Sequence, residues 1–279
     1  MAAIEERVQK LLAQRGLGSR REIETWITSG MVTVNGRLAK LGDKASSDDV
    51  IKVNQREVKW VDAPTVPRVL LYHKPENQVC SRSDPEGRPT VFDSLPEVKQ
   101  GRWISVGRLD FNTSGLLIFT NDGELANRLM HPSYELEREY AVRVYGEVSP
   151  EALKNLTTGV QLEDGMARFT QIKDAGGEGK NHWYHVMLME GRNREVRRLW
   201  DSQEVVVSRL IRIRYGDVLL PSHLRQGKSE EMTLPQVNAL RRLVKMPDYE
   251  PPKVVKKYGL PKHSAFRLKP RVNKNNRDY

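Results

Sequence analysis

The sequence has a single cysteine and no uninterrupted apolar run long enough to cross a membrane. Cys80 alone cannot form a disulfide within the chain, and one thiol argues against a thiolate metal cluster. The first residues, MAAIEERVQKLL, are charged and lack the pattern of a secretion signal. These absences argue against a disulfide-stapled secreted protein and against a membrane-spanning protein. We expect a cytoplasmic protein that acts as a monomer.

Acidic residues are outnumbered by basic ones. The 46 Lys and Arg exceed the 36 Asp and Glu, which gives a formal net charge of +10 and a sequence pI of about 9.6. Such an excess favours a polyanionic partner, most often nucleic acid. No long segment combines a basic helical face with a strongly apolar one, as a membrane-surface helix would. Nucleic acid is therefore favoured, and a DNA or membrane-surface binder driven by charge alone is the alternative.

The first 60 residues have the pattern of a compact module. Apolar residues recur at helical spacing over residues 4–12, and Gly16 can end that helix. Ser19 and Glu22 form a capping box at the start of a second helix, which Gly30 ends. Asn35-Gly36 suits the positive φ angles of a two-residue hairpin turn. We predict two helices followed by strands at residues 32–34, 37–38 and 50–53.

Four arginines lie around the helix junction and the hairpin of this module. They are Arg15, Arg20, Arg21 and Arg37. They could meet phosphates along an RNA stem, or they could form a solvated basic face without a partner. Charge alone weighs the two alternatives equally.

The large domain is organised around residues 107–123, GRLDFNTSGLLIFTNDG. Two short apolar runs, at residues 104–106 and 116–119, predict buried strands on either side of a polar turn. The turn carries Asp110, and Gly107 and Gly115 permit close backbone approach to a ligand. A carboxylate in this position can act as a nucleophile or a base, or it can simply cap the turn. The residues by themselves leave both alternatives open.

The rest of the large domain alternates predicted strands and helices. Apolar and alternating patterns predict strands at residues 69–72, 139–145, 167–172 and 183–189, and a final pair of strands within residues 207–220. Helices are predicted after Asp122, ending at Met130, and after Ser149, with a last one at residues 234–244. The glycine-rich residues 176–179 predict a hairpin connection, since they lack the spacing of a phosphate-binding loop.

Residues 190–200, EGRNREVRRLW, predict a helix with an arginine-rich side. Val196, Leu199 and Trp200 form its apolar face, which directs Arg192, Arg194, Arg197 and Arg198 outward. His182 and His185 face opposite sides of the preceding strand, and no third ligand is evident. We therefore expect no metal site.

These motifs resemble those of a known family. GRLDFNTSGLLIFTNDG resembles the signature of the RsuA-type RNA pseudouridine synthases, and LLAQRGLGSRREIETWITSGMVTVNGR resembles the S4 RNA-binding domain. The His73-Lys74-Pro75 segment, the E-R-E-Y at residues 137–140 and the EGRNREVRR segment are similar to further family motifs. Within the family, the S4 domain and basic tail resemble the RluB branch, whose members act on large-subunit ribosomal RNA.

The resemblance implies roles for individual residues. Asp110 is the catalytic residue, and it attacks the ribose or the uracil, or removes the C2′ proton. Tyr140 stacks on the target base and is a candidate acceptor of the C5 proton, although a lone strand tyrosine is more often a core residue. Arg197 pairs with Asp110 and favours its charged form, and Glu195 replaces the Gln of many members. The remaining site residues, Lys74, Arg108, Arg192, Arg194 and Arg198, are expected to contact RNA or to hold the active-site turn.

The resemblance also fixes the expected architecture and substrate. We expect an α+β protein whose S4 domain precedes a catalytic domain with a mainly antiparallel mixed sheet flanked by helices. The boundaries are residues 1–60 for the S4 domain, 61–67 for a linker, 68–246 for the catalytic domain and 247–279 for a basic, disordered tail. The expected partner is 23S ribosomal RNA, with base flipping and no cofactor. Small-subunit ribosomal RNA, transfer RNA and a non-catalytic ribosome-assembly role are the alternatives.

Overall fold

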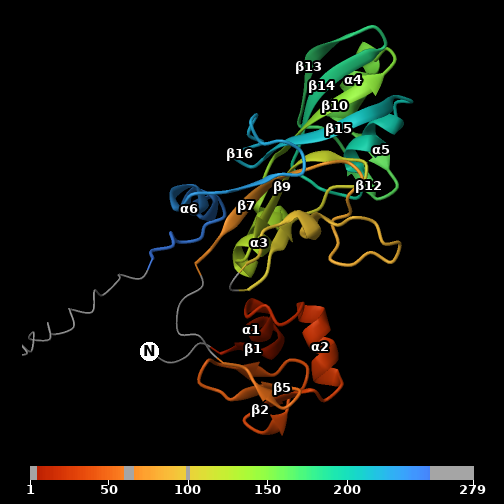
Figure 1. Ribbon diagram of the computed structural model, residues 1–279. Coiled ribbons are helices and arrows are strands. Elements are labelled where there is room, and N and C mark those ends of the chain that lie inside the picture. The colour runs from red at the N-terminus through yellow and green to blue at the C-terminus, as the bar shows by residue number, and fades with distance from the viewer. Residues whose placement is uncertain (1–4, 60–65, 99–100, 252–279) are drawn as a thin grey trace, which may run out of the picture. The chain divides into compact units, whose positions relative to one another are not determined.

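The computed structural model describes residues 5–59, 66–98 and 101–251 of the 279-residue chain. The expected tail falls outside these residues except for its first five positions, and most of the expected linker also lies outside them. The helices and strands fall into two sets, one in residues 6–57 and one in residues 69–243 (Figure 1).

The N-terminal set combines two helices with short strands. Its helices are α1 (Val8–Gln14) and α2 (Arg20–Thr28), and the Ser19–Glu22 capping box is present as predicted. Asn35 and Gly36 have φ angles of 51° and 80°, so the Asn-Gly hairpin is also confirmed. The first helix begins later than predicted, because Glu6–Arg7 (β1) pairs with Lys44–Ala45 (β4). A sheet of order β3-β2-β5-β6 completes this set, with β2 at Val32–Val34, β3 at Arg37–Leu38, β5 at Ile51–Val53 and β6 at Arg56–Glu57.

The C-terminal set is built on a mixed sheet whose strands are mainly antiparallel, as expected. The order along the sheet is β13-β14-β10-β15-β9-β7-β17, with β8 beside β9 and β16 beside β15. The pair β9–β15 is parallel and makes two residue pairs, Ser114 with Ile211 and Gly115 with Arg212. The strands are β7 (Val69–Lys74), β8 (Ile104–Val106), β9 (Ser114–Thr120), β10 (Arg138–Tyr145), β13 (Gln171–Glu178), β14 (Asn181–Leu188), β15 (Val206–Tyr215), β16 (Val218–Leu219) and β17 (Ser229–Glu231).

Helices cover both sides of this sheet. One core gathers strand residues such as Phe119 and Val142 with the inner faces of α4 and α5, and the other packs α3 and α6 against residues such as Leu116 and Ile118. Ser149 caps α4 and Asp122 caps α3, as the sequence predicted. The helices are α3 (Gly123–Met130), α4 (Pro150–Thr158), α5 (Glu195–Asp201) and α6 (Leu234–Leu243), with short 3-10 turns at Val91–Ser94 and Pro132–Tyr134.

One predicted strand is wrong in its extent. Residues 167–172 are divided between β12 (Gly165–Ala167), which pairs with β11 (Val160–Leu162), and the start of β13. The chain breaks there because Phe169 is fully buried and its N–H donates to the Leu156 carbonyl at 2.9 Å. Pairing of β13 with β14 confirms the hairpin, with a register shift between Asp174 and Gly177.

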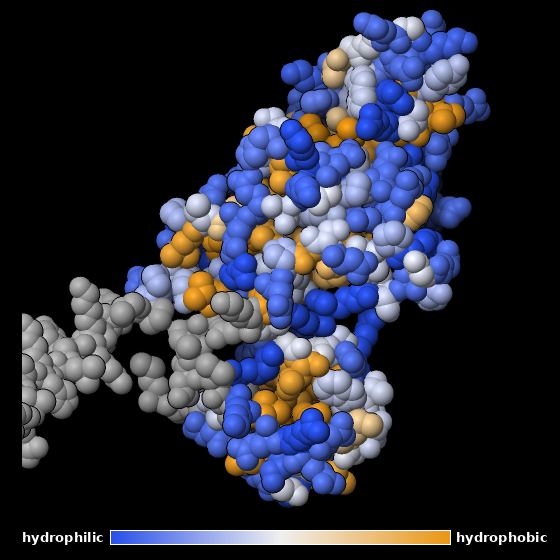
Figure 2. Space-filling view, viewed as in Figure 1, coloured by the Kyte–Doolittle hydropathy of each residue, from blue (hydrophilic) through white to orange (hydrophobic). Residues whose placement is uncertain are grey.

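Most of the surface visible in Figure 2 is hydrophilic, and apolar side chains form small patches between polar ones. No helix among the described residues has both the length and the apolar character needed to span a bilayer.

Candidate active site

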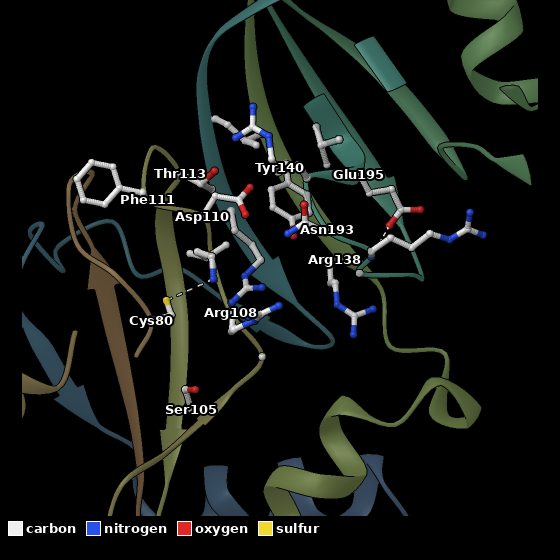
Figure 3. Close-up of a pocket in the computed structure, with 18 of the residues that line it drawn as sticks. Cys80, Ser105, Arg108, Asp110, Phe111, Thr113, Arg138, Tyr140, Asn193 and Glu195 are labelled. Carbon is white, nitrogen blue, oxygen red and sulfur yellow. Dashed lines mark hydrogen bonds between the residues drawn. The ribbon is translucent and has the colours of Figure 1, made fainter. Parts of the chain in front are cut away.

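A pocket of about 650 Å³ lies between the loop that joins β8 to β9, the strands β10 and β15, and the start of α5. Asp110 and Tyr140 both line it, together with Arg108 and Arg194. Figure 3 shows the Asp110 carboxylate directed toward the Tyr140 ring. Three of the segments that carried the family resemblance, in residues 107–123, 137–140 and 190–200, therefore meet at one cavity, although the contacting residues Asn112 and Arg197 lie 85 positions apart in the chain.

The turn that carries Asp110 is held through its backbone. The Thr113 N–H donates to the Asp110 carbonyl at 3.1 Å, and the Asn77 N–H donates to the Phe111 carbonyl at 2.8 Å. The Leu109 N–H lies 3.4 Å from the Cys80 sulfur, which accepts its hydrogen bond. These hydrogen bonds, one within the turn and two to residues 77 and 80, hold the backbone of the turn without using the Asp110 side chain.

Lys74 lies beneath the same turn and is fully buried. Its ammonium donates to the carbonyls of Asp110 at 3.0 Å and Thr113 at 2.8 Å, and to that of Pro75 at 3.0 Å. Burial lowers the pKa of Lys74, while nearby Cys80 and Asp110 act in the opposite direction. The expectation that Lys74 contacts RNA is corrected by this placement, because the side chain is enclosed by protein and instead joins the end of β7 to the Asp110 turn.

The Asp110 carboxylate itself is half-buried in the pocket wall. Within the described residues it forms no hydrogen bond and no ion pair. An aspartate that served only to cap its turn would accept a backbone N–H at short range. Since the backbone and Lys74 hold the turn instead, the structure disfavours the capping alternative. The carboxylate is available to a molecule that enters the pocket.

Tyr140 stands on β10, between Val186 of β14 and Arg212 of β15. Its side chain is 8% exposed and belongs to the larger core, yet it also lines the pocket. In the described part of the chain its hydroxyl has no hydrogen-bond partner. Tyr140 is therefore both a core residue and a pocket residue, because one side of its ring packs in the core and another side lines the cavity.

Arg197 does not project outward, and this part of the helix prediction is wrong. It is 7% exposed, and it donates to the Val207 carbonyl at 3.0 Å and to the Asn112 carbonyl at 2.8 Å. Burial lowers its pKa, with Arg194 acting in the same direction and Asp110 in the opposite one. No direct ion pair joins Arg197 to Asp110 among the residues described. Arg197 instead holds the Asp110 turn and brings a positive charge near it.

The other arginines of this segment differ in how many of their hydrogen-bond donors already have a protein partner. Arg198 forms two hydrogen bonds with the Asp164 carboxylate, at 2.8 and 2.9 Å, and Arg192 binds Glu190 at 2.6 Å and the Met166 carbonyl at 2.9 Å. Both arginines connect the start of α5 to the β11–β12 hairpin. Arg194 is exposed and, among the described residues, contacts only the Asn112 amide oxygen, at 3.5 Å, so it has donors left for RNA.

Glu195 occupies the first position of α5 and is 4% exposed. Its carboxylate accepts the Arg192 N–H at 2.9 Å, and burial raises its pKa. An acidic group is favourable at a helix N-terminus, so the departure from Gln fits this position.

In the N-terminal set, Arg20, Arg21 and Arg37 are exposed. Arg20 and Arg21 open α2, Arg37 begins β3 after the hairpin turn, and Arg15 caps the end of α1. Arg108, in the Asp110 loop, is also exposed and lies at the pocket. RNA contact by these five residues remains a prediction.

Sequence reasoning missed Arg212, which lines the pocket on β15 and is 2% exposed. The segment from Val206 to Tyr215 contains three arginines at similar spacing, and no sequence motif distinguishes this one.

As for metals, no three His, Cys, Asp or Glu side chains gather into a possible binding site within the described ranges. His182 contacts Asp174 at 2.7 Å, and His185 contacts Glu139 at 3.2 Å.

Two family profiles match this chain. Residues 68–202 match the family described as RNA pseudouridylate synthase, and residues 6–51 match the S4 domain. A protein of Escherichia coli strain K12 named ribosomal large subunit pseudouridine synthase B is 57% identical over 249 residues, which are 87% of this chain and 84% of that protein. The chain belongs to the RNA pseudouridine synthase family.

Other relatives and a solved structure agree with this membership. A Pseudomonas aeruginosa protein with the same name is 59% identical over 237 residues, 84% of this chain and 61% of that protein. This chain therefore spans less than two thirds of that relative. A crystal structure of a pseudouridylate synthase superposes with a TM-score of 0.59 at 25% identity, covering 84% of this chain and 99% of the other. The expected fold, an S4 domain followed by a pseudouridine synthase fold, is confirmed.

Proposed function

We propose that this protein isomerises one uridine to pseudouridine in the 23S ribosomal RNA of the large ribosomal subunit. The observation that carries the proposal is the Asp110 carboxylate, which faces the pocket without a partner among the described residues while Lys74 and Arg197 hold its turn. The large-subunit substrate is supported by the names of relatives at 57% and 59% identity. We further propose that the protein acts as a monomer in the cytoplasm.

The reaction breaks the C1′–N1 bond of uridine, rotates the uracil, joins C1′ to C5, removes the C5 proton and leaves a proton on N1. No electrons or groups are exchanged with a second molecule, so the residues require no cofactor. Asp110 attacks the sugar or the base, or takes the C2′ proton, and the three routes share one placement of the carboxylate. Tyr140 offers a ring for stacking and a hydroxyl near the base. The uridine must leave its stack to enter, at a cost of a few kcal/mol that is smallest in loops and bulges.

The test is a map of pseudouridine in ribosomal RNA from cells that lack this protein. We expect one large-subunit position to lose its pseudouridine and to regain it when the wild-type gene is restored. A change only at a small-subunit or transfer RNA position would support the fold and the chemistry but would refute the proposed substrate. If no position changed, the non-catalytic alternative would replace this proposal.

The S4 domain is proposed to capture the RNA before the uridine is flipped. Its core, which includes Val8, Ile23 and Ile51, shares no residue with the two cores of the large domain. Exposed Arg20, Arg21 and Arg37 supply charge for the phosphates of a stem.

Removing residues 1–60 is expected to weaken binding to ribosomal RNA by at least tenfold, a loss of about 1.4 kcal/mol, while the catalytic domain still unfolds cooperatively. The measurements are RNA binding at fixed salt and thermal unfolding followed by circular dichroism. The triple variant Arg20→Gln, Arg21→Gln, Arg37→Gln is the matched control, since it keeps the domain and removes the charge. Loss of a cooperative transition in the truncated protein would contradict the proposed boundary.

A further inference from the structure

Arg212 is a buried cation in the active-site pocket. It lies directly opposite Tyr140 in the antiparallel pair β10–β15, and residues opposite one another in such a pair share a face of the sheet. Both side chains line the pocket. With only 2% of its surface exposed, Arg212 belongs to the inner wall, whereas Arg194 and Arg108 are exposed.

The hydrogen bonds of Arg212 leave part of its guanidinium unused. The Nε group donates to the Leu116 carbonyl at 2.8 Å, and the guanidinium lies 5.2 Å from the centre of the Tyr215 ring. Neither Nη1 nor Nη2 has a hydrogen-bond partner among the described residues, and Nη2 is shielded from solvent. Among the described residues, no carboxylate forms an ion pair with Arg212. Leaving a buried charge and its donors unpaired is costly, and such a group is usually found with an anion or a strong acceptor.

Another arginine of the same strand is paired with carboxylates, in contrast to Arg212. Arg214, two residues further along β15, binds Glu139 at 2.8 Å and Glu137 at 3.0 Å. The nearby Cys80 offers Arg212 no negative charge, because burial raises the pKa of its thiol even though Lys74 and Arg212 oppose the effect. The protein therefore pairs one arginine of this strand with two glutamates and leaves the one in the pocket without an anion.

The missing acceptor fits the base rather than the phosphate of an incoming nucleotide. A guanidinium only donates hydrogen bonds, so its partner must supply an acceptor oxygen. Phosphates stay with the backbone at the mouth of the pocket, where Arg194 and Arg108 are exposed. The inner wall beside Tyr140 receives the flipped base, and a uracil ring carries two acceptor oxygens, O2 and O4.

We propose that Arg212 donates a hydrogen bond to a carbonyl oxygen of the flipped uracil and stabilises the negative charge that develops there. This inference rests on the proposed function. When the C1′–N1 bond breaks, its electron pair remains on the uracil and is shared by the ring and its carbonyl oxygens. The charge is lost again when C5 bonds to C1′, and the C5 proton then departs while N1 takes up a proton, so that the product base is neutral. A positive donor in a water-poor site lowers the energy of the charged species more than that of the neutral base.

The test combines changes in the protein with single-atom changes in the RNA. The RNA is a large-subunit transcript in which the uridine that the wild-type protein modifies is replaced by 2-thiouridine or 4-thiouridine. Sulfur accepts hydrogen bonds poorly, so one of the two replacements is expected to slow wild-type single-turnover isomerisation by about 10- to 100-fold beyond its effect on Arg212→Met. In Arg212→Met, uridine is isomerised slowly, and the same sulfur replacement changes the rate by less than about threefold.

Two further variants separate contact with the base from a role in packing. Arg212→Lys keeps a cationic donor and is expected to retain part of the sulfur effect, and it also serves if Arg212→Met fails to fold. Arg209→Met, an exposed arginine on the same strand, is the control and should behave as wild type. A sulfur effect of equal size in wild type, Arg212→Met and Arg212→Lys would overturn the proposal, because a packing role lowers all rates by the same factor.

The outcomes also separate this inference from the proposed function. Wild-type protein that formed no pseudouridine in the transcript or in cells would refute the function itself. An active wild-type protein that was indifferent to sulfur at both positions would refute only the role of Arg212.

Discussion

Asp110→Asn is expected to abolish pseudouridine formation while RNA binding and folding stay almost unchanged. The amide has the same shape as the carboxylate but is neither a base nor a nucleophile, so the single-turnover rate should fall by about 10⁴-fold or more. Folding should be spared because the carboxylate forms no bond with the described residues, and the turn is held by Lys74 and Arg197. The free energy of unfolding should therefore change by less than about 0.5 kcal/mol.

The measurements are single-turnover isomerisation, RNA binding and urea unfolding of the same preparations. Asp217→Asn, an exposed aspartate in the turn between β15 and β16, is the matched control and should keep full activity. Residual activity of Asp110→Asn within tenfold of wild type would exclude Asp110 as the catalytic group. A large loss of stability would show instead that the side chain holds the turn.

Arg197→Met is expected to cause the second largest loss of activity. The side chain is buried, donates to the carbonyls of Val207 and Asn112, and lies near enough to Asp110 for their charges to interact. Methionine leaves both carbonyls without a donor and removes the positive charge, so the turn loses a support and the carboxylate loses its counter-charge. We expect the single-turnover rate to fall by about 10²- to 10³-fold, with RNA affinity within about threefold of wild type. The free energy of unfolding should drop by about 2–4 kcal/mol.

The neighbouring Arg194 provides the opposite expectation. It is exposed at the mouth of the pocket, so Arg194→Met should weaken RNA binding and leave the rate at saturating RNA close to wild type. Arg197→Lys should recover part of the rate through its charge but not the two separated hydrogen bonds. If Arg197→Met lowered binding and rate equally, Arg197 would be assigned to RNA capture rather than to the reacting centre.

Elements that depend on neighbours along the chain could be predicted from the amino-acid sequence. The capping box of Ser19 and Glu22 and the hairpin turn at Asn35-Gly36 follow from local backbone chemistry. The strands around Asp110 follow from two short apolar runs that need burial. The resemblance to family motifs predicted that Asp110, Tyr140 and Arg197 belong to one active site, and the structure places all three at or beside one pocket.

The burial of polar side chains, in contrast, depends on contacts between segments that are distant in the chain. Lys74 follows a buried strand and looks like a surface lysine, but four backbone carbonyls converge on its ammonium. The apolar residues of α5 indicated an outward Arg197, whereas the carbonyls of Asn112 and Val207, which lie on other elements, draw it inward. The hydrogen-bond acceptors of Arg197 come from segments that are distant in the chain, and the apolar periodicity of one helix carries no information about such contacts.

Arg212 shows that the sequence pattern of one strand is likewise insufficient to predict which side chains face a site. In a regular strand Arg212 and Arg214 would share a face, because side chains alternate with a period of two. The register of β10 with β15 shifts between Glu139 and Tyr140, so that Glu139 faces Arg214 while Tyr140 faces Arg212, and Ile213 is the extra residue. This bulge sends Arg214 to the glutamates on one side of the sheet and Arg212 to the pocket on the other. The sequence shows two similar arginines, Arg212 and Arg214, on one strand. The pairing of that strand with β10, which is distant in the chain, sets which of the two faces the pocket.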